Sequence, residues 1–291
     1  MGSAHQVFDG LKSTTMQWQA KLQLNYSVEQ QRCVVRHAHS GPLRILKSLY
    51  PEGERVCHNV LVHPPSGLVG GDQLEIDLHL QAGAHAVLTT AGATRFYGSD
   101  ALTASQLVHA QLDDGATLEW LPLEALAYNH CQAHNQAVFQ LQPGSRLMAW
   151  DVTALGLPHA NQAFVQGRFQ QHLEIKDTWL ERGVVDAADR RLLHSPLGLN
   201  GHSCQSTLVF AQGTALSDTE REQVIHLARA LCEDHPLKLQ AGVSSPEPRV
   251  VVVRVLSDQV EAAMALLRSI WLQWRSRCWQ LPAVAPRIWA M

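Results

Sequence analysis

The sequence predicts a mainly β fold with two C-terminal helices packed on the β body. Three observations support this: apolar and polar residues alternate through the first two-thirds of the chain, Gly, Pro, Asp and Asn separate the alternating segments, and apolar residues take helical spacing in the last third. The chain has 291 residues, 46% hydrophobic and 17% charged, which suits one folded body with a large core. We expect a single domain over residues 1–291, with a β-rich body at about 18–210 and an α/β portion at about 211–291.

The β-rich body is predicted from segments such as 22–28, 74–80 and 169–175, which alternate at every second residue. Such strands bury one face and expose the other, as expected of antiparallel sheets. The breaks at 81–84 and 113–116, and a third at 142–145, each precede another strand-like run, so we expect turns there.

The C-terminal portion changes to helical periodicity. Ser217 stands three residues before Glu220 in the order of a capping box, which predicts a helix that ends near Pro236. A β-branched run at 249–256 predicts a buried strand. A second helix is expected from about Asp258, with apolar residues at helical spacing.

Charge and hydropathy narrow the classes of function. With 23 basic and 26 acidic residues the formal charge is -3, which argues against nucleic acid as a partner. No run approaches the roughly 18 apolar residues of a membrane span, and residues 1–10 lack the apolar segment of a secretory signal. We expect a cytoplasmic protein without membrane contact.

Histidine is unusually frequent, with 16 against 23 Lys plus Arg, which raises a metal hypothesis. On a strand, His37 and His39 would share a face and could act as two ligands. The six cysteines are scattered without a C-x-x-C pair, so neither a structural zinc site nor a disulfide framework is expected. No G-x-S-x-G elbow or H-E-x-x-H helix is present, which leaves an enzyme without a visible nucleophile or metal helix.

Two loops and several acids are the remaining candidates. Residues 63–72 hold two prolines and three glycines before a strand entrance at Asp72, so Gly70 and Gly71 are expected to shape a structural turn. Residues 88–97 form a small-residue loop ending in Thr94, Arg95, Phe96 and Tyr97, suited to internal packing or to a partner. Strand-end carboxylates such as Asp151 and Glu181 are either solvated or buried, and buried ones must be paired or coordinate a cation.

Aromatic residues mark the C-terminus. Trp271 and Trp274 are spaced as core residues of the second helix. Trp289 belongs to a terminal Pro-Arg-Ile-Trp that either folds back onto the body or docks a partner.

A series of loops in a fixed order carries a family resemblance: Gly41-Pro42-Leu43, Tyr50-Pro51-Glu52, Cys57-His58, His63-Pro64-Pro65, Gly67 to Asp72, Gly92 to Tyr97, Leu118 to Pro122, Trp150-Asp151, Glu181-Arg182 and Pro286 to Trp289. In this order and spacing, the chain resembles the urease accessory protein UreD family, also called UreH, from about Trp18 to its last residues. The resemblance implies an extended layered or β-helix-like arrangement of antiparallel or mixed sheets.

The resemblance also implies a function. A protein of this family would be a non-catalytic chaperone that binds apo-urease, recruits UreF and, through UreF, the GTPase UreG, and takes part in inserting nickel into the urease active site. No cofactor would be permanently bound, since nickel would be in transit and GTP would be held by UreG.

The resemblance shifts the interpretation of particular residues. Asp72, Thr94, Asp151 and Glu181 would line or gate an ion path, because carboxylates and hydroxyls bind such a cation weakly enough to release it. Partner contacts are expected from a further set of residues: Arg95, Phe96, Tyr97, Trp271, Trp274 and Trp289.

Two alternatives remain open at this point. One is a metal-dependent enzyme on a β scaffold, with His37 and His39 as ligands and a third ligand from His58 or His63. The other is a pure adaptor that never touches metal.

Overall fold

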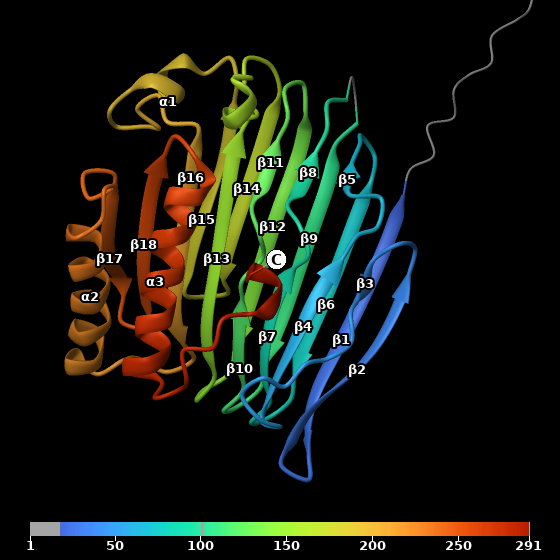
Figure 1. Cartoon of the computed structure of the whole chain (residues 1–291), viewed down its shortest axis with the longest axis vertical. Helices are drawn as coiled ribbons and strands as arrows, with labels where there is room; N and C mark the ends of the chain where they lie inside the picture. Colours follow the sequence, from blue (N-terminus) through green and yellow to red (C-terminus); the bar gives the residue numbers. More distant parts are fainter. Residues whose placement is uncertain (1–17, 100–101, 291) are drawn as a thin grey trace, which may run out of the picture.

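The computed structural model describes residues 18–99 and 102–290. Residues 1–10, for which the sequence predicts no secretory signal, lie outside these ranges. Two β-sheets lie face to face, and the main hydrophobic core fills the space between them. The two C-terminal helices cover the outer face of the second sheet (Figure 1). The mainly β prediction with two C-terminal helices is therefore confirmed.

The first sheet has seven strands. In spatial order they are β15 (Trp179–Asp186), β14 (Arg168–Ile175), β12 (Gln132–Leu141), β9 (Ala104–Leu112), β6 (Gln73–Leu80), β1 (Gln19–Glu29) and β2 (Arg32–Ser40).

The second sheet has eleven strands. Its main path is β17 (Ala241–Glu247), β18 (Val250–Ser257), β16 (Cys204–Gln212), β13 (Arg146–Leu155), β10 (Thr117–Trp120), β7 (His85–Thr90), β4 (Val56–Val62) and β3 (Arg44–Ile45). Three short strands extend it beyond a bend: β5 (Gly67–Leu68), β8 (Thr94–Phe96) and β11 (Ala125–Ala127).

The middle of the chain winds as a solenoid, in which the long strands of successive coils alternate between the two sheets. Neighbours within each sheet are therefore parallel from β6 to β14 and from β4 to β13. Antiparallel pairs occur at the ends, as in β1 with β2 and β14 with β15. The expectation of antiparallel sheets from the alternation was wrong for the middle coils, because alternation reports one buried face and not the direction of the neighbouring strand.

The predicted turns lie at corresponding corners of successive coils. Gly83, Gly115 and Gly144 each take a left-handed conformation, with φ of 72°, 68° and 76°. A residue with a Cβ is strained in that region, so glycine fits each corner. The spacing between these glycines is unequal, which is why the solenoid leaves no repeat of fixed period in the sequence.

Three helices and two 3₁₀ turns complete the fold of the described residues: α1 (Arg190–His194), α2 (Asp218–Glu233), α3 (Val260–Cys278), η1 (Pro158–Ala160) and η2 (Arg287–Ala290). The capping box predicted at the start of α2 is present, with Ser217 and Glu220 exchanging hydrogen bonds. Trp271 and Trp274 of α3 are 0% exposed and belong to a second core against the outer face of the second sheet. None of the helices in the described ranges combines the length and apolar character needed to cross a membrane.

Candidate functional site: a polar row between the sheets

Three amide side chains form a row across the inner face of the first sheet. Asn135 on β12 lies in register with Gln106 on β9 and with Gln171 on β14. Each occupies the core-facing phase of its strand, where the neighbours two residues away are apolar and buried, such as Val108 and Ala137. The row therefore places polar groups inside an otherwise apolar core, where each must find a partner.

Hydrogen bonds join this row to the facing sheet. The Thr94 hydroxyl on β8 donates to the Gln106 side-chain oxygen (3.3 Å), and the Gln106 amide donates to the Asn135 oxygen (3.1 Å). The Asn135 amide donates to one carboxylate oxygen of Asp151 on β13 (2.8 Å), and the Thr153 hydroxyl donates to the other (3.1 Å). Two of the predicted ion-path residues, Thr94 and Asp151, are thus the two ends of one hydrogen-bonded chain.

A second group of polar residues continues the row toward the β15 edge. Asp151 lies in register with Thr207 on β16, whose hydroxyl donates to Glu181 on β15 (2.6 Å). The Gln205 amide donates to Gln171 (2.8 Å), which lies in register with Asn135. Glu181 is also paired with Arg254, which lies at the surface end of this group.

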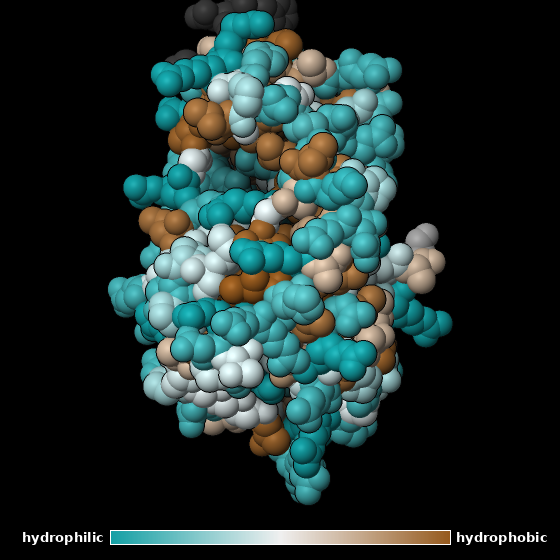
Figure 2. Space-filling model, turned by 90° about the vertical axis from the view of Figure 1, so that its left-hand side faces the viewer, coloured by the Kyte–Doolittle hydropathy of each residue, from teal (hydrophilic) through white to brown (hydrophobic). Residues whose placement is uncertain are grey.

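Three cavities follow the same direction. A cavity of about 270 Å³ is lined by apolar residues of β4 and β6 and reaches Thr94 and Gln106. A constriction of about 20 Å³ follows, bounded by Thr94, Gln106, Asn135 and Asp151, and it has room for about one water molecule. A third cavity of about 560 Å³ includes Gln171, Glu181 and Thr207. The side of the molecule that carries β15 and β17 shows a hollow in its surface (Figure 2).

Asp151 is the electrostatic centre of the row. Burial, aided by the nearby Glu181 charge, raises its pKa to about 6, although hydrogen bonds from Thr153 and Asn135 act in the opposite direction. No cationic side chain in residues 18–99 or 102–290 forms an ion pair with Asp151. At neutral pH the row therefore holds a buried negative charge that only neutral donors stabilise.

Asp72 has a different local role. It is 3% exposed, and its carboxylate accepts hydrogen bonds from the backbone N–H groups of Trp18 (2.8 Å) and Val69 (2.9 Å). These contacts hold the turn before β6, where Gly71 has a φ of 91° and a Cβ at Gly70 would lie 1.8 Å from the Ser99 hydroxyl. The turn expected at Gly70 and Gly71 is present, and contact between Asp72 and nickel stays a prediction.

The residues expected to meet partners are mostly packed inside. Phe96 is 0% exposed and packs edge-on against Phe169, and Tyr97 packs against Tyr128. Trp289 folds back onto the body, where its ring stacks on Trp150 with 5.4 Å between centroids and its N–H donates to Thr89 (2.9 Å). Together with the burial of Trp271 and Trp274, this packing gives these aromatic side chains structural roles, and partner contact by Arg95 stays a prediction.

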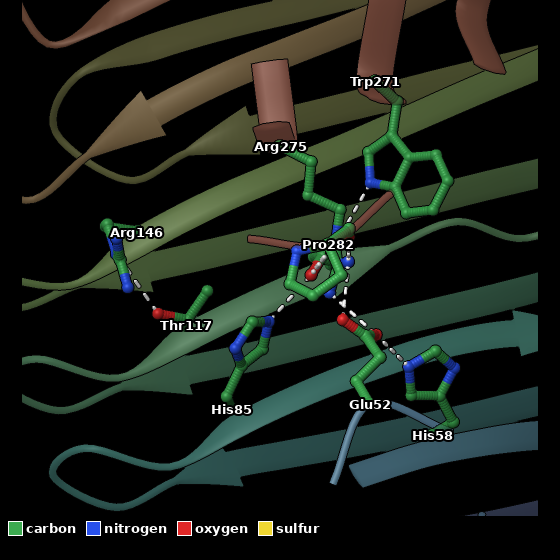
Figure 3. Close-up of polar contacts among 9 residues, drawn as sticks. Glu52, His58, His85, Thr117, Arg146, Trp271, Arg275 and Pro282 are labelled. Atoms are coloured by element: carbon green, nitrogen blue, oxygen red, sulfur yellow. Dashed lines mark hydrogen bonds and ion pairs between the residues drawn. The ribbon is translucent and has the colours of Figure 1, made fainter. Parts of the chain in front are cut away.

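Sequence patterns did not reveal a buried ion network on the outer face of the second sheet (Figure 3). Glu119 of β10 accepts hydrogen bonds from His85 (2.7 Å) and from the indole of Trp271 (2.6 Å), and pairs with Arg275 of α3 (2.9 Å). Arg275 also pairs with Glu52 (2.7 Å), which contacts His58 (2.6 Å). Burial opposes ionisation of Glu119, but His85 and Arg275 outweigh it and lower its pKa to about 2. The network ties α3 to the sheet.

Comparison with known proteins decides the family. The model of the UreD urease accessory protein family matches residues 19–290. This chain belongs to the UreD family. It is similar to the urease accessory proteins UreD of Albidiferax ferrireducens (56% identity over 95% of this chain and 100% of the relative), Verminephrobacter eiseniae (56%, the same coverage) and Variovorax paradoxus (53%, 94% and 100%). The resemblance inferred from the loops is confirmed, and with it a role as a urease accessory protein.

Fewer than half of the 16 histidines of this UreD family member pair with acids in the described residues. Seven of them pair with a carboxylate: His58, His79, His85, His109, His159, His172 and His202. The enzyme alternative takes its third ligand beside His37 and His39 from His58 or His63, and of these two His58 is already paired with Glu52. Within the described part of the chain, no three or more His, Cys, Asp or Glu side chains are grouped to hold a metal ion.

Sequence inspection missed most of the row. Gln106, Asn135, Gln171 and Gln205 were not singled out, although the signal was present in each strand. An amide takes a core-facing position in an alternating strand whose other core-facing residues are apolar, as in Ala133-x-Asn135-x-Ala137. A buried amide is costly without partners, so several of them in phase predict a buried polar feature.

Proposed function

We propose that this chain acts in urease maturation as a non-catalytic scaffold that binds apo-urease and recruits UreF and, through it, UreG, which hydrolyses GTP. We further propose that the polar row passes nickel between the two large cavities. The observation that supports the passage is the hydrogen-bonded chain from Thr94 to Asp151, which spans the constriction.

The chemistry of the row suits a cation in transit. Amide and hydroxyl oxygens and a carboxylate are ligands for hard to borderline cations, and without imidazole or thiolate they release the ion more readily. The ionised Asp151 lacks a cationic partner in the described residues, so a passing Ni²⁺ ion would supply the missing positive charge. Because the constriction holds about one water, the ion would exchange hydration waters for side-chain oxygens there.

The role of Glu181 follows from its position. It lies on β15 and lines the cavity of about 560 Å³. Its carboxylate accepts a hydrogen bond from the Thr207 hydroxyl and forms an ion pair with Arg254. A cation that leaves the constriction would meet this second carboxylate next. Competition between the ion and Arg254 for Glu181 would keep the ion weakly held.

The test is urease activation with purified or co-expressed urease, UreF and UreG. Asp151→Ala and Glu181→Ala should still form the complex but deliver less nickel per urease active site. Glu174→Ala is the matched control, since Glu174 lies on β14 with its carboxylate paired to His172 on the outer face of the first sheet. Full nickel loading with Asp72→Ala, Asp151→Ala and Glu181→Ala alike would refute the passage and favour the pure adaptor.

The scaffold role is tested separately. Omission of this chain should abolish GTP-dependent activation of urease while urease still folds. Recovery of nickel-loaded urease without it, at the same UreG and GTP concentrations, would contradict the role.

A further inference from the structure

The His37 and His39 side chains differ from the seven histidines that pair with a carboxylate. Both are exposed on β2, the edge strand of the first sheet. Their rings are nearly parallel, at an interplanar angle of 21°, with centroids 6.4 Å apart. Within residues 18–99 and 102–290, neither imidazole forms an ion pair with a carboxylate, so both sets of ring nitrogens are available.

The strand register places the pair on the core-facing side of the sheet. His37 lies opposite Leu24 and His39 opposite Leu22, and both leucines are 0% exposed. The imidazoles themselves are exposed because the facing sheet ends at β3, which has only two residues. The pair therefore lies at the open end of the space between the sheets, and among the described residues no further strand lies beside β2 to obstruct a ligand.

We propose that His37 and His39 form a surface site for one divalent transition-metal ion of the Ni²⁺, Cu²⁺ and Zn²⁺ class, with water in the remaining positions. Imidazole nitrogen is a favoured ligand for these ions. Two nitrogens that each lie about 2.1 Å from one ion are about 3 Å apart. Residues two apart on a strand point to the same face, so rotation of the two exposed side chains can direct one nitrogen of each ring toward a common ion.

A site with two protein ligands exchanges its ion readily. The seven carboxylate-paired histidines lack this freedom, because a carboxylate already occupies one of their ring nitrogens. The proposed site needs no third protein ligand, in keeping with the finding that the described residues contain no larger cluster.

The position of the site gives it a role that rests on the proposed function. β2 pairs with β1, and β1 pairs with β6, whose Leu74 and Ile76 line the cavity of about 270 Å³. An ion held by His37 and His39 is thus two strands from the first cavity of the row. We infer that the pair collects nickel at this end of the molecule before the ion enters the row. This role rests on the proposed passage, but metal binding by the two histidines does not.

The test is titration of the purified full chain with NiSO₄ by calorimetry, in a buffer that does not bind metal. His37→Asn and His39→Asn should each weaken nickel binding at least about tenfold, because a chelating second ligand acts at high effective concentration. His226→Asn, an exposed histidine on α2 without a histidine two residues away, is the matched control and should bind nickel as the wild type does.

A metal site elsewhere would give a different pattern. If the His37→Asn, His39→Asn double variant binds nickel with wild-type stoichiometry and affinity, the proposal is overturned. If Asp151→Ala abolishes nickel binding and the histidine variants do not, the ion is held in the polar row, which overturns this site and leaves the passage intact. Circular dichroism and thermal unfolding of each variant verify that the fold is unchanged.

Discussion

The replacement Asp151→Asn should stabilise the folded chain at neutral pH. Burial and the Glu181 charge raise the pKa of Asp151 from 3.8 to about 6, about two units, and each unit corresponds to about 1.4 kcal/mol. The folded state therefore holds this proton more tightly than the unfolded chain does. As pH rises from about 4 to about 6 the wild type loses about 3 kcal/mol of stability through this group, and above pH 6 the loss is constant.

The Asn side chain of the Asp151→Asn variant carries no charge, so the stability of this variant does not fall with pH through position 151. Its amide can still accept one hydrogen bond, and the Thr153 hydroxyl can turn to accept from the new NH₂ group. The stability difference between Asp151→Asn and wild type should thus grow by about 3 kcal/mol between pH 4 and pH 7. The charged Asp151 thus lowers stability at neutral pH while it serves the proposed cation path, and such a cost is expected of a functional residue.

Urea unfolding at pH 4, 5, 6, 7 and 8 measures the effect, because the midpoint reports stability when the slope is unchanged. Asp113→Asn is the control, since that carboxylate is 32% exposed and pairs with His79 on the outer face. A stability difference between Asp151→Asn and wild type that does not change from pH 5 to pH 8 would refute the reasoning.

Further predictions concern stability. Glu119→Gln leaves the fully buried Arg275 with Glu52 as its remaining carboxylate partner and should lower the free energy of unfolding by about 3 kcal/mol, against less than about 1 kcal/mol for Glu261→Gln at an exposed pair; equal urea midpoints for the two variants would contradict this. Trp289→Ala should cost about 2 kcal/mol or more by removing its stacking and its hydrogen bond, and an unchanged Tm would show that η2 contributes nothing. Asp72→Asn should cost about 1–3 kcal/mol, since its amide oxygen can accept one of the two backbone N–H bonds but its NH₂ group cannot accept the other, and a wild-type urea midpoint would count against that role.

Local patterns in the sequence specify local structure well. Alternation gave the strands around Leu24 and Ile76, and the Ser217 capping box gave the start of α2, because each depends on residues a few positions apart. Alternation could not predict whether neighbouring strands run parallel or antiparallel, since a strand with one buried face has the same pattern in both kinds of sheet.

Long-range pairing explains what was missed at the site. Glu119 and Arg275 are separated by 156 residues, so no local pattern joins them. Asp151 could be singled out as a carboxylate beside a tryptophan, but its partner Asn135 is brought to it only when the two sheets pack together. The in-phase amides Gln106 and Asn135 could have been recognised from their strands alone.

The most direct test of the passage compares two adjacent residues of β12 that face opposite ways. Both residues border the constriction, but the Asn135 side chain hydrogen-bonds to Asp151 within the row, whereas the Gln136 side chain contacts His109 on the outer face (3.2 Å). Nickel is counted per active site in urease matured with Asn135→Leu or with Gln136→Leu, after each variant is shown to form the complex. We predict that Asn135→Leu blocks the row and leaves urease poor in nickel, while Gln136→Leu loads it as the wild type does. Equal nickel content with both variants would contradict a path through the row.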